Sequence, residues 1–481
     1  MLRKGENFIA LMVFGLVFYI SAYFSVTDVL PSAVPVHHDD YTNYAAGGSP
    51  WTWSWIRPLS TLLIHFLAQI GPDWLIWSVR LLVLIFVFLV WKLICEFYRP
   101  VYYWSTLILF AVGSFSTPII VEYARYTGMI THLLSGCFGL LAVYFLLREV
   151  DNSQKSYGVQ LSFFFLILSV LAKEDFILLY AVSFVYVVVL LRTGRKRVLG
   201  WGIAGLIFCM VLIASAKFMA SSNFLGVVDT TSTYYVDMSP VSIAQTVWLY
   251  LIGARHPAMT SHGLVVAGCF VFSASAVVVL YVCRRSVPSA AYFVVATLSI
   301  IAPYSLLPNH VNAYYELLWL PMLIASCLMA MIELLRMFTR ISPKWRAGGA
   351  LFALVLLVGA LMVIDYPGRK SVAAWYDSVS AINDNTIKLL YSQKDHINSV
   401  QNVCISGANS FSPWYMHNGK YLSYVIGIHA KWHIIIDLSS PLYAGMRAGA
   451  NASNGQTILV SGAELPSVQC LHINLEEATR L

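Results

Sequence analysis

An acidic pair, Asp39 and Asp40, follows the first apolar segment of the chain and is itself preceded by His37 and His38. A carboxylate in such a position can act as a general base that takes a proton from a hydroxyl group. Adjacent side chains point in different directions, so we expect only one aspartate to serve as the base. The same four residues could ligate a divalent cation, but we favour a site without a metal. An acidic pair in a long loop can also be no more than solvated surface.

Positively charged residues occur near the ends of later apolar segments. Arg57 begins an amphipathic stretch expected to lie along a membrane surface, Arg125 follows the third apolar segment, and Lys173 separates the fifth from the sixth. Together with His310, these groups could bind a phosphate and stabilise the charge that develops as it leaves. Simpler roles stay open: the arginines could anchor lipid headgroups, Lys173 could pair with Glu174, and a single histidine is more often structural. Neighbouring residues expected to support the site are His38, Glu122, Glu174 and Tyr315.

These candidates must be positioned by helices that cross a membrane. The chain has 481 residues, of which 59% are hydrophobic and 11% are charged, whereas soluble domains carry about 25% charged residues. Its apolar residues form about eleven blocks, most of them close to the ~20 residues that a helix needs to cross a bilayer. The blocks are 7–27, 74–95, 101–120, 129–147, 159–172, 175–192, 198–218, 263–283, 289–307, 313–333 and 348–366.

Basic residues indicate how these helices are oriented. With the N-terminus inside the cell, most Lys and Arg residues of the short loops fall on the cytoplasmic side, as at 195–197 and 284–285. The C-terminus then lies outside, and so do the acidic pair, the cationic candidates and their supporting residues. This shared face is typical of a site for an anionic, partly hydrophobic substrate. The net charge of +7 reflects topology and does not indicate a nucleic-acid partner.

The composition becomes more polar from about residue 367. We therefore predict a transmembrane domain over 1–366 and a small extracytoplasmic α/β domain over 367–481, with a helix around 373–391 and strands at 403–405, 433–436 and 457–460. Cys404 and Cys470 lie in this outer segment, where an oxidising compartment permits a disulfide; two buried free thiols are the alternative.

Four short motifs, in their order and sidedness, resemble the GT-C superfamily of polytopic glycosyltransferases, which use polyprenyl-phosphate sugars. They are His-Asp-Asp-Tyr at 38–41, Trp-Ile-Arg-Pro-Leu at 55–59, Glu-Tyr-Ala-Arg-Tyr at 122–126 and Ala-Lys-Glu-Asp at 172–175. The resemblance covers roughly residues 1–335 in layout. Chain length, the span count and the modest outer domain look most like bacterial and phage-encoded serotype-converting O-antigen glucosyltransferases.

This resemblance implies a hexosyltransferase in a bacterial inner membrane with its active site facing the periplasm. A hexose such as glucose would pass from polyprenyl phosphate to an extracytoplasmic acceptor, such as the O-antigen of lipopolysaccharide, by one inverting displacement. The acidic pair would supply the base, and the cationic candidates would hold the donor phosphate. No cofactor is expected, with a divalent metal as the alternative.

Two other classes fit parts of the sequence. An O-antigen polymerase or ligase also uses lipid-linked sugars, but such proteins usually concentrate arginines and a histidine in one large outer loop, and the loop at 219–262 holds few of them. A transporter of lipid-linked saccharides would place ionisable residues near the bilayer midplane and show paired repeats, and neither is evident. A non-catalytic scaffold is the least favoured, because the charged residues cluster. The sequence does not distinguish glucose from other hexoses, nor one acceptor from another.

Overall fold

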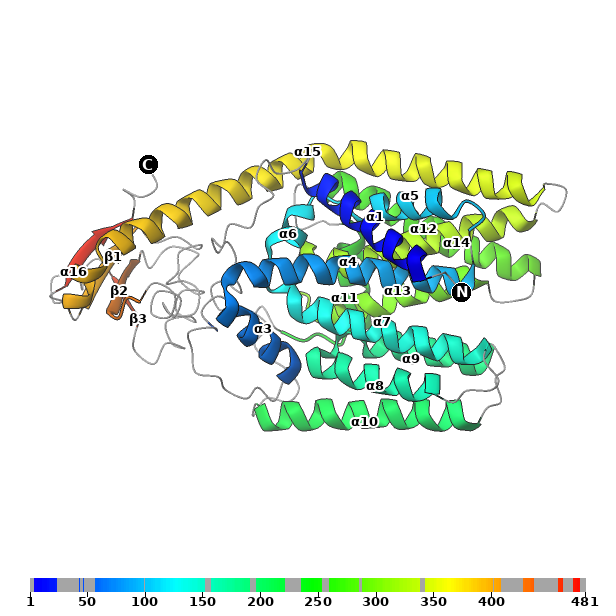
Figure 1. Cartoon of the computed structure of the whole chain (residues 1–481), viewed down its shortest axis with the longest axis horizontal. Coiled ribbons are helices and arrows are strands. Elements are labelled where there is room, and N and C mark those ends of the chain that lie inside the picture. The colour runs from blue at the N-terminus through cyan, green and yellow to red at the C-terminus, as the bar shows by residue number, and fades with distance from the viewer. Residues whose placement is uncertain are drawn as a thin grey trace.

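The computed structural model describes residues 4–23, 43, 46, 57–98, 100–151, 157–190, 196–220, 235–252, 259–284, 288–337, 342–400, 402–407, 427–436, 457–461 and 470–475. Within these ranges the chain forms a bundle of roughly aligned helices and, toward its C-terminus, a small β-sheet (Figure 1). One helix, α15, extends from the bundle to the sheet.

Every predicted apolar block contains helix. The corresponding helices are α1 (Lys4–Tyr23), α4 (Pro72–Phe97), α5 (Tyr103–Ser114), α7 (Met129–Asp151), α8 (Tyr157–Ala172), α9 (Ile177–Val185) with the π-helical turn η2 (Tyr186–Leu190), α10 (Lys196–Ala220), α12 (Thr260–Arg284), α13 (Ser289–Ser305), α14 (Glu316–Met337) and the first part of α15 (Pro343–Ser392). In the described ranges, seven helices are long and apolar enough to cross a membrane: α1, α4, α7, α10, α12, α14 and α15. The bundle is thus consistent with a helical membrane protein, while the count of eleven spans and their orientation stay predictions.

Side-chain exposure follows the position of each helix in the bundle. The central helix α14 is buried along most of its length, whereas outer helices expose large apolar side chains such as Met12, Met210 and Val278. Apolar surface on this scale is unfavourable in water and favourable against lipid. Close packing inside depends in part on glycine: a Cβ at Gly139 of α7 would lie 2.6 Å from the Cβ of Phe176.

Three shorter helices lie outside the apolar blocks. Helix α3 (Pro58–Ile70) begins directly after Arg57 and corresponds to the predicted amphipathic stretch. Helix α6 (Ile120–Arg125) continues the chain after α5. Helix α11 (Pro240–Ile252) was not predicted; it lies within 219–262, which the sequence suggested was only a loop, and its 13 residues are too few to cross a bilayer.

The predicted boundary between residues 366 and 367 falls inside a continuous helix. Helix α15 has 50 residues and passes through Pro367; a short helix, α16 (Lys394–Ser399), follows it. Figure 1 shows α15 running along the bundle, bending partway and continuing to the sheet. The predicted helix at 373–391 is therefore the second half of α15, and the first strand begins only at Asn402.

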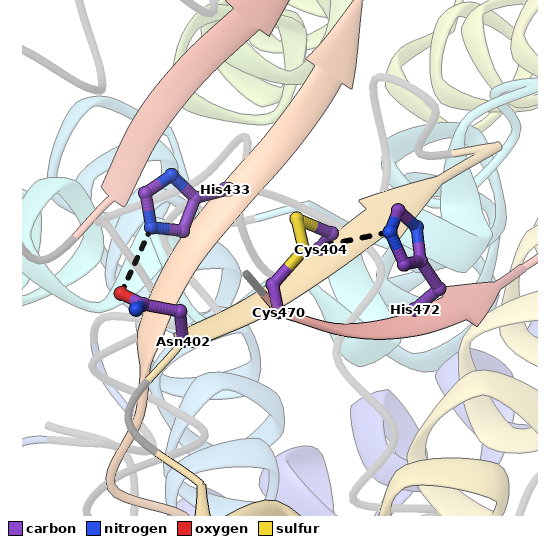
Figure 2. The surroundings of a disulfide bond; sticks show 5 residues. All are labelled: Asn402, Cys404, His433, Cys470 and His472. Atoms are coloured by element: carbon purple, nitrogen blue, oxygen red, sulfur yellow. Dashed lines mark hydrogen bonds between the residues drawn. A yellow bond between two sulfur atoms is a disulfide. The ribbon is translucent and has the colours of Figure 1, made fainter. Parts of the chain in front are cut away.

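The sheet has four parallel strands in the order β3-β2-β1-β4. They are β1 (Asn402–Ser406), β2 (Lys431–Ile436), β3 (Thr457–Ser461) and β4 (Leu471–Asn474). The three predicted strands are confirmed, and β4 was missed because it is only four residues long. Cys404 of β1 and Cys470, next to the start of β4, form a disulfide (Figure 2), which decides between the two alternatives left open by the sequence.

Candidate functional site

Buried polar residues gather at one end of the bundle, the end from which α15 leaves toward the sheet. Helices α3 and α6 also lie at this end, which we call the sheet-side end (Figure 1). The polar groups form two clusters that come from different helices. Each cluster contains a histidine, at least one carboxylate and a basic side chain.

The first cluster is centred on Lys173, in the turn between α8 and the 3₁₀ turn η1 (Glu174–Phe176). Its Nζ lies 2.6 Å from Nε2 of His132 and 3.6 Å from Oδ2 of Asp175. His132 Nδ1 lies 2.6 Å from Asp175 Oδ2 and 2.9 Å from the Tyr304 hydroxyl. We name His132, Lys173, Asp175, Tyr304 and Tyr315 the Lys173 cluster.

These contacts determine how the imidazole is protonated. A lysine ammonium carries only donors, so Nε2 of His132 accepts from Lys173, and the proton of the ring lies on Nδ1, where it is donated to Asp175. Burial alone would raise the pKa of Asp175, but the Lys173 charge and the contact with His132 together hold that pKa below its usual range. Asp175 is therefore suited to orienting the other two groups, and it is a poor proton acceptor.

Neighbouring helices fix the backbone that carries Lys173. The Ser135 hydroxyl on α7 donates to the Lys173 carbonyl at 2.6 Å, and the Ser60 hydroxyl on α3 donates to the Ala172 carbonyl, also at 2.6 Å. The absence of a side chain at Gly139 allows η1 to approach α7 closely. The turn is thus held from two sides by serine hydroxyls.

Aromatic rings cover another side of the Lys173 cluster. Tyr304, at the end of α13, stacks on Tyr315 with ring centroids 4.0 Å apart, and Tyr315 belongs to the turn η4 (Ala313–Tyr315) that precedes α14. The Tyr315 hydroxyl lies 3.2 Å from Nε2 of His310, and Asn312 also contacts that ring. Because His310 and Asn312 are half-buried, the cluster reaches toward the molecular surface here.

The second cluster is centred on His262 of α12. Its Nδ1 lies 2.8 Å from Oδ1 of Asp365 on α15, and its Nε2 forms a hydrogen bond with Glu316, the first residue of α14. Thr117 also donates to Glu316, at 3.4 Å. Arg369, one turn after Asp365, is buried close enough to interact with it electrostatically. We name His262, Glu316, Asp365 and Arg369 the His262 cluster.

Both ring nitrogens of His262 face carboxylate oxygens, which accept hydrogen bonds when ionised. The arrangement therefore requires an imidazolium, or a proton retained on one of the two carboxylates. His262, Glu316 and Asp365 are 1%, 3% and 0% exposed. With both nitrogens engaged inside the protein, this histidine has no ring atom left for a ligand.

The structure separates the predicted site residues into groups. Lys173, His310 and Tyr315 are brought together in or beside the Lys173 cluster. Arg57, next to α3, is close enough to His132 to interact with it electrostatically, and its Nε is buried without a hydrogen bond in the described part of the chain. Glu174 lies on η1 and is half-buried.

Glu122 and Arg125 belong to α6, and the Tyr126 ring that follows them lies 5.0 Å from the ring of Tyr314, the neighbour of Tyr315. Arg125 is 3.8 Å from Asp377 on the second half of α15. Burial raises the pKa of Glu122 to about 8, and its Oε2 makes no hydrogen bond within the described ranges. His38, Asp39 and Asp40 lie outside the described residues, so the predicted base is not placed.

Sequence reasoning missed several members of the two clusters. His132 and Tyr304 lie within predicted apolar blocks, and neither was selected as a candidate. Asp175 was noted in the turn but was not assigned to the site, and Asp365 and Arg369 were not considered. Ionisable residues within or near membrane-spanning segments are costly and usually functional, and that rule would have selected His132 and Asp365.

Metal binding finds little support among the described side chains. Only Cys404, Cys470 and His472 group there as three ligands could around an ion. The two sulfurs are already joined to each other, with His472 Nε2 3.6 Å from Cys470 Sγ (Figure 2). In the His262 cluster, the two carboxylates lie on opposite nitrogens of one ring and do not converge on a common point.

No protein-family model and no curated protein matches this sequence.

Proposed function

We propose that the chain is a membrane glycosyltransferase that moves a hexose from a polyprenyl-phosphate donor to an acceptor outside the cytoplasm. One observation carries the proposal: the Lys173 cluster gathers a cation, its orienting groups and aromatic rings at one end of an apolar helical bundle. A lipid-phosphate donor needs both parts, since its tail requires apolar helices and its departing phosphate requires fixed positive charge.

Lys173 would stabilise the phosphate as the glycosidic bond to it breaks. Its ammonium is held by His132 and Asp175, so little reorganisation would be needed when negative charge develops. Arg57 would add a second positive charge to the same side. Tyr315 and His310 would line the approach to this group, with the ring of Tyr315 held in place by its stacking on Tyr304.

The acceptor base would be Asp39 or Asp40. Asn43, the next described residue along the chain, is buried and its side chain donates to Thr127 Oγ1 at 3.0 Å. Thr127 lies two positions before the first residue of α7 and five positions before His132.

The position of the ionisable groups favours this enzyme over a transporter. His262 is the third residue of α12 and Glu316 is the first residue of α14. Both therefore lie at helix ends, whereas coupling residues of transporters lie near the membrane midplane. An O-antigen polymerase or ligase, which would use the same class of lipid donor, is the alternative enzyme.

The test is sugar transfer by the purified, full-length protein. Incubation with defined polyprenyl-phosphate hexoses should release the sugar to an acceptor glycan, and the nature of the product separates transfer of one hexose from polymerisation. Changing the base to Asn, in Asp39→Asn or Asp40→Asn, should lower transfer by about 10²–10⁴ while donor binding persists. Near-normal transfer in both single variants and in the double variant would falsify the proposed mechanism.

A further inference from the structure

A buried arginine on α4 lacks the partners that such a residue normally has. Arg80 is 2% exposed, and its Nε donates to the Ala124 carbonyl of α6 at 2.9 Å. Its two terminal nitrogens, Nη1 and Nη2, are also buried and have no partner within ordinary hydrogen-bond distance in the described part of the chain, although the Tyr19 hydroxyl is close enough to interact with the guanidinium. Neither the Lys173 cluster nor the His262 cluster includes this residue.

The charges around Arg80 make its burial still less favourable. The guanidinium of Arg125 is close enough to repel it, and no described carboxylate pairs with Arg80. Arg125 has its own partner in the half-exposed Asp377, at 3.8 Å. Two like charges buried side by side are strongly destabilising unless an anion lies against them.

The position of Arg80 suits a lipid headgroup. Arg80 is eight residues after Pro72, and side chains on a helix tilt toward its N-terminus, which places the guanidinium near the sheet-side end. It lies 5.0 Å from the centroid of the Trp77 ring, and Tyr19 is also nearby. Trp77 is 41% exposed. Aromatic residues of this kind concentrate at the depth of lipid headgroups.

We propose that Arg80 and Arg125 form a binding site for the phosphate group of an anionic membrane lipid. Arginine's planar fork can donate two parallel hydrogen bonds to one phosphate, which would engage Nη1 and Nη2 of Arg80. The site is built from α4 and α6 next to α1 and does not include Lys173, and it does not depend on the transfer reaction proposed above.

The experiment uses full-length protein in nanodiscs of phosphatidylcholine with a minor fraction of phosphatidylglycerol. Retained lipids are counted by native mass spectrometry. The wild type should retain phosphatidylglycerol in preference to phosphatidylcholine, and Arg80→Gln should reduce that preference about tenfold. Arg80→Lys keeps the charge without the fork and should lose part of the preference. The matched control is Arg148→Gln, because Arg148 also lies over an aromatic ring, 5.4 Å from Tyr144.

Three outcomes would overturn the proposal. The first is a wild type without preference for the anionic lipid, a result that needs no variant to fold. The second is an Arg80→Gln protein that melts normally and keeps the wild-type preference, or a control that loses as much. The third is displacement of phosphatidylglycerol by millimolar inorganic phosphate, which would assign the site to free phosphate instead of a lipid. Because lipid retention is the readout, failure here is distinguishable from failure of the transfer assay.

Discussion

The Lys173 cluster and the His262 cluster are made of the same kinds of side chain but are positioned by different elements. Around Lys173 the residues come from turns between helices, η1 and η4, and from helix ends. Around His262 they come from the bodies or first turns of three long helices, α12, α14 and α15. Turns can present side chains to a ligand, whereas a group shared between packed helices mainly fixes those helices to each other.

The two clusters also differ in how close they lie to exposed parts of the molecule. The members of the Lys173 cluster are themselves buried, and the cluster borders on half-buried His310 and Asn312. The His262 cluster has both ring nitrogens engaged and three members that are 3% exposed or less. A histidine with carboxylate partners is therefore not by itself a sign of catalysis. What separates the two clusters is their surroundings, because only the Lys173 cluster borders on half-buried polar side chains, His310 and Asn312, in the described part of the chain.

Removing His262 should give the largest effect, and it should be on stability. His262→Ala leaves Glu316 and Asp365 as uncompensated buried carboxylates, so we expect a loss of about 3–5 kcal/mol. Thermal unfolding in detergent measures it, with the more accessible His65→Ala as control. The combined variant His262→Met, Glu316→Gln, Asp365→Asn, Arg369→Met should recover much of the loss, because it also removes the buried charge of Arg369, which interacts with Asp365. A low transfer rate in correctly folded His262→Ala protein would contradict the structural role.

Removing Lys173 should give the largest effect on the reaction. Lys173→Ala should raise the barrier to transfer by about 2–4 kcal/mol, as expected for loss of a group that stabilises developing charge. Single-turnover kinetics with the lipid donor measures this. Lys388→Ala is a suitable control, since Lys388 is an exposed lysine on α15. Unchanged kinetics in Lys173→Ala would move the phosphate site elsewhere.

Glu122 belongs to neither cluster, and it should make the free energy of unfolding depend on pH. Its pKa is about 8 in the folded protein and near 4.5 when exposed, so between these values the folded state holds more protons than the unfolded state. Stability should thus be greatest below pH 4.5 and fall as the pH rises to about 8, by at most ~1.4 kcal/mol per pH unit. Melting temperatures of Glu122→Gln should lack this decline, while the exposed Asp73→Asn should keep it. A decline that persists in Glu122→Gln would have another origin.

The smallest effect is expected at the edge of the Lys173 cluster. Tyr315→Phe removes the hydroxyl next to His310 and keeps the stacked ring. The activation free energy of transfer should therefore rise by about 0.5–1.5 kcal/mol. The loss should appear in kcat/KM, and Tyr314→Phe provides the comparison at the neighbouring position. If Tyr315→Phe were as damaging as Lys173→Ala, the hydroxyl would have a direct role in the reaction.

Much of the fold could be predicted because its signals are local. Apolar blocks long enough for membrane helices are visible in the sequence, and so are short β-branched runs such as Thr457–Ser461. Helix α11 was missed because its apolar stretch is short. It also lies in a region that the predicted orientation of the membrane helices left as a loop between two spans. The break at residue 366 was placed by a change in composition, whereas backbone hydrogen bonding continues through Pro367 and the helix with it.

The candidate site was only partly predictable because its contacts are not local. Sidedness predicted that Lys173, His310 and Tyr315 share one face, and the structure places them in or beside one cluster. Sidedness alone could not show that Arg125 faces α15, or that His132 lies against Lys173, 41 positions away in the chain. His262 and Asp365 are 103 positions apart, and only the packing of α12 against α15 brings them into contact.

The unbroken helix α15 also determines the distance between the helical bundle and the sheet. Its 50 residues correspond to about 75 Å, of which a bilayer core accounts for roughly 30 Å. The remainder acts as a strut that determines how far from the bundle the sheet is held. Removing seven residues from its second half would shorten the strut by about 10 Å and rotate the sheet by only ~20°, whereas removing two would turn it by about 200° for a 3 Å change. Distance and orientation of the sheet can therefore be varied almost independently.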